Sequence, residues 1–178
     1  TKYFPGVKAL DDISFTANGG EVLALMGENG AGKSTLLKVL NGDYQQTSGE
    51  YLVNGEPCHF NSPREAVAAG IGVIYQERQI MLELTVGENI FLGRLPTGFM
   101  GRIKMREVHS RAQAVIDEFG LDMKSTDKVK DLSVAYQQMV EIMKAYSREN
   151  LKMIAFDEPT ASLSDSEIDS LFRICLLY

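Results

Sequence analysis

Residues 27–34 have the composition and spacing of a loop that binds phosphate groups. They read Gly27, Glu28, Asn29, Gly30, Ala31, Gly32, Lys33 and Ser34, which matches the pattern G-x-x-x-x-G-K-[ST] in full. Glycines let the backbone wrap so that several N–H groups converge on one anion. Lys33 would reach the β- and γ-phosphates, and the Ser34 hydroxyl can ligate Mg²⁺. The loop therefore predicts a nucleoside triphosphate site and leaves adenine and guanine undistinguished.

Two adjacent carboxylates, Asp157 and Glu158, follow the apolar residues 153–156. Ligands of parallel α/β sheets bind at the carboxyl ends of the strands, where such a pair would lie. We expect Asp157 to hold Mg²⁺ through water and Glu158 to polarise the attacking water. Carboxylates at a strand end can also simply cap the next segment, but the phosphate loop favours the catalytic interpretation.

The flanking segments predict the elements that would position these groups. Strands are expected at residues 13–15 and 21–26, the second buried on both faces, and a helix at 34–40. Asn54 and Gly55 predict the turn of a hairpin. Further expected elements are a helix started by a capping box at residues 62–65, a strand at 71–75, a helix over 108–119 ended by Gly120, a helix from Ser133, a strand at 153–156 and a last helix with a capping box at 164–167.

The order of these elements predicts an α/β core that a helical segment interrupts. We expect residues 1–76 to form N-terminal antiparallel β elements and the phosphate-loop part of the core. Residues 77–145 would be the helical insertion, and residues 146–178 would return to the core. The chain has 178 residues, a hydrophobic content of 44% and a formal net charge of −6. This acidic balance gives no support to a nucleic-acid partner.

Several separate segments together resemble one known family. Beside the phosphate loop these are residues 4–10, 74–77, 85–93, 132–142 and 157–160. They make the chain similar to the ATP-binding subunit of ABC transporters, of the monosaccharide-importer type. Residues 92–96 and 154–164 look most like L-arabinose importers, with ribose, galactose and xylose importers close behind. The resemblance implies a P-loop ATPase fold, ATP and Mg²⁺ as ligands, and ATP hydrolysis coupled to sugar import.

The resemblance also implies roles for individual residues. Phe4 lies where the family has an aromatic side chain that stacks on adenine. A core aromatic is the open alternative for Phe4, and the neighbouring Tyr3 leaves the choice of ring open. Gln76 would touch Mg²⁺ and link the core to the helical insertion. Glu158, Lys33 and Gln76 would serve catalysis, and Ser34, Gln76 and Asp157 the metal. The implied nucleotide-binding residues are Phe4, Gly27, Glu28, Asn29, Gly30, Ala31, Gly32, Lys33, Ser34 and Thr35.

The family signature Leu-Ser-Gly-Gly-Gln corresponds here to Leu132, Ser133, Val134, Ala135 and Tyr136. In the family, this helix N-terminus contacts the γ-phosphate that is bound in the opposite subunit. The same Ser133 can also act as a plain N-cap, and the two roles are compatible. Side chains replace both glycines, which makes a close backbone approach to phosphate harder.

The resemblance further implies partners and a location. Residues 79–93 would face transmembrane permease subunits, and a second nucleotide-binding domain, tandem or in a homodimer, would complete the ATP site. A periplasmic or extracellular sugar-binding protein would act indirectly. The expected location is peripheral, at the cytoplasmic face of the cell membrane.

One element of the family pattern has no counterpart in the sequence. The family has a histidine downstream of the last helix that contacts the γ-phosphate, whereas His59 and His109 both precede the carboxylates. We therefore expect a fragment of the first of two tandem domains, which lacks its first strand as well. Two alternatives stay open, an ATP-binding module with little turnover of its own and a soluble ABC ATPase outside transport.

Overall fold

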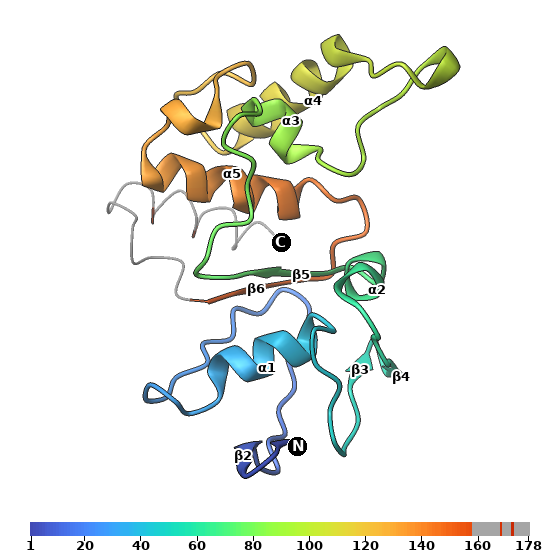
Figure 1. Cartoon of the computed structure of the whole chain (residues 1–178), viewed down its shortest axis with the longest axis vertical. Helices are drawn as coiled ribbons and strands as arrows, with labels where there is room; N and C mark the ends of the chain where they lie inside the picture. Colours follow the sequence, from blue (N-terminus) through green and yellow to red (C-terminus); the bar gives the residue numbers. More distant parts are fainter. Residues whose placement is uncertain (158–167, 169–171, 173–178) are drawn as a thin grey trace. The chain divides into compact units, whose positions relative to one another are not determined.

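The computed structural model describes residues 1–157, 168 and 172 (Figure 1). The chain divides into two compact units, each held together by its own internal contacts. The first is Thr1–Val73 with Asn150–Asp157, and the second, among the described residues, is Ile74–Glu149. The second unit overlaps residues 77–145, which the sequence predicts to be the helical insertion. The elements are β1 (Lys2–Phe4), β2 (Val7–Leu10), α1 (Lys33–Leu40), β3 (Leu52–Val53), β4 (Glu56–Pro57), α2 (Pro63–Ala68), β5 (Ile71–Ile74), α3 (Val86–Ile90), the 3₁₀ turn η1 (Phe99–Gly101), α4 (Met105–Glu118), the 3₁₀ turn η2 (Val129–Asp131), α5 (Val134–Tyr146) and β6 (Met153–Phe156).

Strands β5 and β6 pair with each other and place the end of β6 in the first unit (Figure 1). The Gly70 carbonyl, just before β5, accepts hydrogen bonds from the backbone N–H of Lys152 at 2.8 Å and of Met153 at 3.2 Å. A Cβ on Gly70 would lie 2.2 Å from the Asn150 carbonyl oxygen, so only glycine permits this approach. Because both strands begin at this junction, they run in the same direction. Asp157 therefore stands at the carboxyl end of β6.

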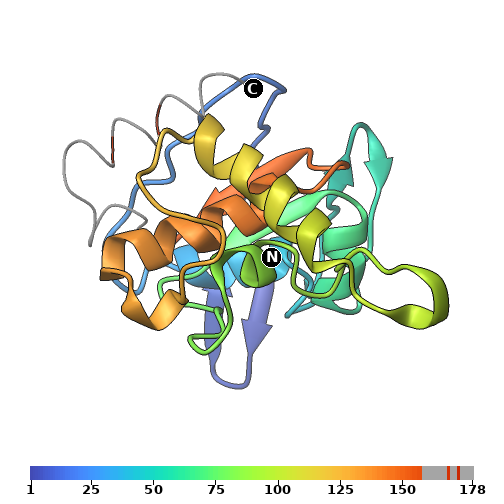
Figure 2. The ribbon, with the colours of Figure 1, turned by 90° about the horizontal axis from the view of Figure 1, so that it is seen from above.

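Two short hairpins belong to the first unit and are seen from above in Figure 2. In β1–β2, Phe4 pairs with Val7, and Gly6 between them has φ +78°. In β3–β4, Asn54 and Gly55 have φ +55° and +81°, the conformation of a type I′ turn. The hairpin predicted from Asn54 and Gly55 is confirmed.

The prediction of strands at residues 13–15 and 21–26 is wrong. Both segments lack regular secondary structure and are exposed to solvent, with Met26 90% and Val22 56% exposed. A strand depends on ladder hydrogen bonds to a neighbour. Within this stretch, the Glu21 N–H donates a hydrogen bond to the Asn18 carbonyl across a turn. Within the described residues, no strand pairs with either segment, so the apolar pattern alone does not make a strand.

The main helices form where hydrophobic spacing predicts them. Helix α1 begins at Lys33, and α4 buries Val108, Ala112 and Ile116 along one face. Gly120, at φ +65°, follows α4 as the expected stop. Helix α5 starts after Ser133, whose hydroxyl oxygen accepts the Tyr136 N–H at 3.2 Å.

The capping box expected at the start of α2 differs in detail. Ser62 is the N-cap, but its side chain makes no capping hydrogen bond. Glu65 instead accepts the backbone N–H of Asn61 at 2.8 Å, one residue further back than a capping box requires. Pro63 at the first helical position already fixes the backbone there, which reduces the need for a side-chain cap.

Helix α3 packs against both α4 and α5 and forms the core of the second unit. A full capping box starts α3, with the Thr85 hydroxyl bound by Glu88 N–H. The hydrogen bond from Thr85 N–H lowers the pKa of the Glu88 carboxyl. Asn89 is fully buried and binds the backbone N–H and carbonyl of Met81 at 2.8 and 2.9 Å. Among the described helices, none has the length and apolar character needed to cross a bilayer.

Candidate nucleotide site

The phosphate loop lies directly against the β1–β2 hairpin. Gly32 has φ +93°, and a Cβ there would stand 2.4 Å from the Ala9 carbonyl oxygen and 3.0 Å from a Leu10 methyl group. Both the backbone conformation and the close approach therefore require glycine. Gly30 also has positive φ, at +87°, but nothing lies within 4 Å of a Cβ there. Gly32 thus packs the end of the loop against β2, the strand that pairs with β1 and its residue Phe4.

Lys33 directs its ammonium group back into the loop. Its Nζ donates to the Gly27 carbonyl at 2.6 Å and to the Glu28 carbonyl at 3.1 Å. The loop therefore closes around a positive charge that its own backbone oxygens hold. A polyphosphate, with stronger acceptor oxygens than a carbonyl, would find this charge already in the loop.

The N-terminus of α1 is open for an anion. Its N-cap is Gly32, no side chain caps the first turn, and no acidic residue lies there. The backbone N–H groups of Lys33 and Ser34 therefore have no partner within the helix, and the helix dipole adds positive potential at this end. This is the physical basis of phosphate binding at a helix start.

Ser34 and Asp157 meet although 123 positions separate them. The Ser34 hydroxyl donates to Asp157 Oδ2 at 3.0 Å, which joins the start of α1 to the end of β6. In octahedral coordination with bonds of about 2.1 Å, neighbouring oxygen ligands stand about 3 Å apart. The two oxygens therefore have the spacing of two direct Mg²⁺ ligands, and the water-mediated role expected for Asp157 stays a prediction.

No group of three or more His, Cys, Asp and Glu side chains that could hold a metal occurs among the described residues. Mg²⁺ in nucleotide sites is usually bound by one or two protein oxygens, phosphate oxygens and water. A metal here would accordingly rely on Ser34, Asp157 and the nucleotide.

Phe4 is half-buried, and its ring is in contact with another aromatic residue. Tyr44 meets it edge to face, with ring centroids 5.2 Å apart at 77°. The ammonium of Lys2 lies 4.9 Å from the centre of the Phe4 ring. The adenine-stacking role of this ring stays a prediction. Tyr44 was not found by sequence reasoning, because no local pattern links it to Phe4.

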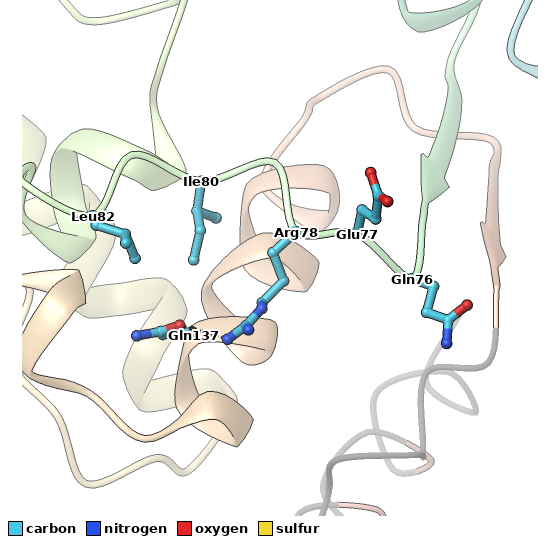
Figure 3. A pocket seen from close by; sticks show the side chains of 6 residues that line it. All are labelled: Gln76, Glu77, Arg78, Ile80, Leu82 and Gln137. Atoms are coloured by element: carbon cyan, nitrogen blue, oxygen red, sulfur yellow. Dashed lines mark hydrogen bonds between the residues drawn. The ribbon is translucent and has the colours of Figure 1, made fainter.

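Gln76 is exposed at the start of an irregular segment in the second unit. It lines an open cavity of about 450 Å³ together with Glu77, Arg78, Ile80, Leu82 and Gln137 (Figure 3). The side chains of Arg78 and Gln137 point toward one another, whereas that of Gln76 points away from them. Gln76 and Asp157 belong to different units, so the metal-binding role of Gln76 stays a prediction.

The signature residues form the start of α5. Ser133 is exposed and caps the helix, and Val134 is 51% exposed. The N-cap role of Ser133 is confirmed, and the contact of this end with a nucleotide in another subunit stays a prediction.

Glu158, the predicted catalytic carboxylate, and the capping box at residues 164–167 lie outside the described residues. Arg78 and Gln137 were missed in the sequence, because only the tertiary structure brings them together.

Comparisons with known proteins agree with the fold. The family model described as ABC transporter matches residues 10–161. The arabinose import ATP-binding protein AraG of Yersinia pestis is 51% identical over 173 residues, covering 97% of this chain and 33% of that protein. The AraG protein of Vibrio parahaemolyticus is 51% identical over 174 residues, covering 98% of this chain and 34% of that protein. The chain thus spans about a third of the length of the curated relatives it matches.

Two solved structures illustrate the likeness in fold. The ADP conformation of the ATP-binding cassette MJ1267 matches with a TM-score of 0.80 at 28% identity, covering 99% of this chain and 72% of that one. The dimeric post-hydrolysis state of the cassette MJ0796, bound to ADP and Pi, matches with a TM-score of 0.75 at 25% identity, over 93% of this chain and 72% of that one. With its α/β P-loop fold and its inserted helices, the chain belongs to the ABC transporter family and is an ATP-binding cassette.

Proposed function

We propose that the protein containing this chain binds Mg·ATP at the phosphate loop and hydrolyses it to drive import of a monosaccharide. The observation that carries the proposal is the meeting of Ser34 and Asp157 at 3.0 Å beside the loop that holds the Lys33 ammonium. This arrangement would join a helix start that binds an anion to a carboxylate that holds a metal ion.

Binding would depend on groups that the fold already positions. The backbone N–H groups of residues 27–35 and the Lys33 ammonium would neutralise the β- and γ-phosphates. Asn29, Ala31 and Thr35 would contribute through their backbone within this loop, as the family resemblance implies. Phe4 would stack on the base. Ser34, Asp157 and Gln76 would hold Mg²⁺, which would offset the charge that develops on the phosphate oxygens.

Catalysis would be mainly a matter of positioning and electrostatics. Glu158 would orient a water molecule in line with the γ-phosphorus and accept its proton as the bond to ADP breaks. The donors around the γ-phosphate would stabilise the transition state more than the ground state. The N-terminus of α5, with Ser133, would complete the site from a second cassette, tandem or in a homodimer. A dimeric post-hydrolysis cassette among the structural neighbours supports this part.

The transported sugar and the partners rest on the relatives. The proteins named arabinose import ATP-binding protein AraG support L-arabinose or a related sugar as the cargo. Transmembrane permease subunits would dock on residues 79–93, at the cytoplasmic face of the membrane. A sugar-binding protein would deliver the cargo on the other side.

The experiment is to compare the complete wild-type protein with Glu158→Gln. We expect the variant to keep Mg·ATP binding and to lose hydrolysis by about a hundredfold or more, because the water loses its base. If Glu158→Gln turned ATP over at the wild-type rate, the catalytic assignment would be wrong. If the wild-type protein bound Mg·ATP without turnover at any protein concentration, the chain would be a binding module.

A further inference from the structure

Gln137 uses both ends of its side-chain amide to join two segments that are distant in sequence. Its Oε1 accepts a hydrogen bond from Arg78 Nη1 at 2.6 Å (Figure 3). Its Nε2 donates to the Val129 carbonyl at 3.1 Å and to the Leu132 carbonyl at 3.2 Å. Gln137 therefore connects the segment after Gln76 to the peptide that leads into α5.

The carbonyl groups that Gln137 binds lie in the peptide just before α5. Leu132 immediately precedes the N-cap Ser133 and has extended backbone dihedrals. Ser133 binds the Tyr136 N–H, so the first turn is fixed from within by a single short side chain. The amide of Gln137, one turn further along, fixes the same entry from outside the first turn. Loss of the Gln137 amide would therefore remove two hydrogen bonds from the peptide that leads to the first N–H groups of α5.

The segment after Gln76 is held along one face of α5. Glu141 Oε1 accepts the Gln79 N–H at 3.1 Å, and Lys144 Nζ donates to the Gln79 carbonyl at 3.1 Å. Gln137, Glu141 and Lys144 follow one another at spacings of four and three, which puts them on one helix face. Of these three residues, Gln137 is the one that also reaches the start of the helix.

An open cavity lies beside the contact between Arg78 and Gln137. Its volume of about 450 Å³ is lined by Gln76, Arg78 and Gln137 among others. Arg78 is exposed, and its backbone belongs to a segment without regular secondary structure. A displacement of the segment that carries Gln76 would therefore pull on the Arg78–Gln137 hydrogen bond before it disturbed the packed core.

We propose that Gln137 is a positioning residue that, through Arg78, couples the segment of Gln76 to the N-terminus of α5. This inference rests on the proposed ATPase function. In that function Gln137 would touch no nucleotide. It would act by orienting the first turn of α5 toward the γ-phosphate bound in the opposite cassette. Its loss should lower the rate of hydrolysis and leave the affinity of the phosphate loop unchanged, because that loop belongs to the other unit.

The test measures kcat, KM and the equilibrium Kd for Mg·ATP in the complete protein. We expect Gln137→Ala and Arg78→Ala each to lower kcat about tenfold with Kd within about twofold of wild type. The double variant should be no slower than the slower single variant, because both changes remove one shared interaction. Arg78→Lys, which keeps a cationic donor for Oε1, should recover most of the lost kcat.

Gln113 on α4 provides a matched control. Its Nε2 donates to Asp117 and to the Met123 carbonyl, and its Oε1 accepts the Ser125 N–H. Gln113→Ala thus removes as many bonds from the same unit, away from α5. It should lower the unfolding midpoint as much as Gln137→Ala while kcat stays within about twofold of wild type.

Three outcomes decide the matter. An active wild-type protein whose kcat is unaffected by Gln137→Ala, or is lowered equally by Gln113→Ala, overturns the positioning role alone. Effects of Gln137→Ala and Arg78→Ala that multiply in the double variant overturn the coupling through Arg78. A wild-type protein that neither binds nor hydrolyses Mg·ATP overturns the proposed function, and the positioning role falls with it.

Discussion

The hydroxyl group of Ser34 donates a hydrogen bond of 3.0 Å to Asp157 Oδ2. Ser34 is the second residue of α1, and Asp157 directly follows β6. The bond spans 123 positions of the sequence, so only the folded first unit can form it. The fold of the first unit therefore positions the start of α1 next to the carboxylate at the end of β6.

Removal of the Ser34 hydroxyl should weaken the metal-dependent part of nucleotide binding. Ser34→Ala removes an oxygen ligand and leaves Asp157 without this donor, so we expect Mg·ATP affinity to fall about tenfold or more. Binding of ATP in EDTA should change less. Ser34→Thr, which keeps the hydroxyl and fits the motif, is the control and should bind as wild type does. Equal loss in Ser34→Ala and Ser34→Thr would contradict a role for the oxygen.

Gly32 and Gly30 form a matched pair for testing how the loop rests on β2. Both have positive φ, so alanine strains the backbone by about 1 to 2 kcal/mol at either position. Only at Gly32 would the added Cβ also meet a backbone oxygen, Ala9 O at 2.4 Å. Gly32→Ala should therefore lower the free energy of unfolding by about 2 kcal/mol more than Gly30→Ala, measured by urea unfolding. Equal losses of unfolding free energy in the two variants would mean that residue 32 of the loop does not pack closely against Ala9.

Tyr51 carries a buried hydroxyl group that has no hydrogen-bond partner among the described residues. Burial raises the pKa of Tyr51 to about 12, with a smaller contribution from Cys58. Its ring packs edge to face on Phe60 at 5.5 Å. Tyr51→Phe keeps this packing and removes the unpaired hydroxyl, so stability should stay equal or rise by up to about 1 kcal/mol. A loss of more than about 1 kcal/mol in thermal or urea unfolding would show that the hydroxyl is paired.

Glu141 should make stability depend on pH. Burial raises the pKa of its carboxyl, opposed by the Gln79 hydrogen bond and by the charges of Lys144 and Arg78. Because the pKa is higher in the folded than in the unfolded state, its contribution to stability is present at low pH and is lost as pH rises through the folded value.

Glu141→Gln removes this titration. The stability of the variant relative to wild type should therefore rise as pH increases from about 4 to about 7. Urea unfolding of both proteins across that range measures the difference. A relative stability that is constant or falls with pH would contradict a raised pKa.

Local signals in the sequence were enough to predict elements whose main stabilising contacts are with residues nearby in the sequence. The phosphate loop followed by α1, the turn at Asn54 and Gly55, and the Ser133 cap each depend on neighbours within a few residues. The strand expected at residues 21–26 failed because a strand also needs a partner elsewhere in the chain. The capping box predicted at residues 62–65 did not form, and Glu65 accepts the Asn61 N–H instead.

Long-range relationships were beyond sequence reasoning. The motif predicted that Ser34 and Asp157 act on one metal ion, but their direct bond follows from how β6 is placed. Nothing in the local sequence links Arg78 to Gln137, or Phe4 to Tyr44. Such pairs depend on the three-dimensional path of the chain, which local sequence patterns do not reveal.

The most direct test of the account is the equilibrium binding of Mg·ATP to the complete protein and to its Lys33→Ala variant. The account predicts saturable binding by the wild type. It predicts a loss of affinity of about a hundredfold or more in Lys33→Ala, because the loop loses the cation that meets the phosphates. Equal affinities of the two proteins for Mg·ATP would contradict the assignment of the loop as the nucleotide site.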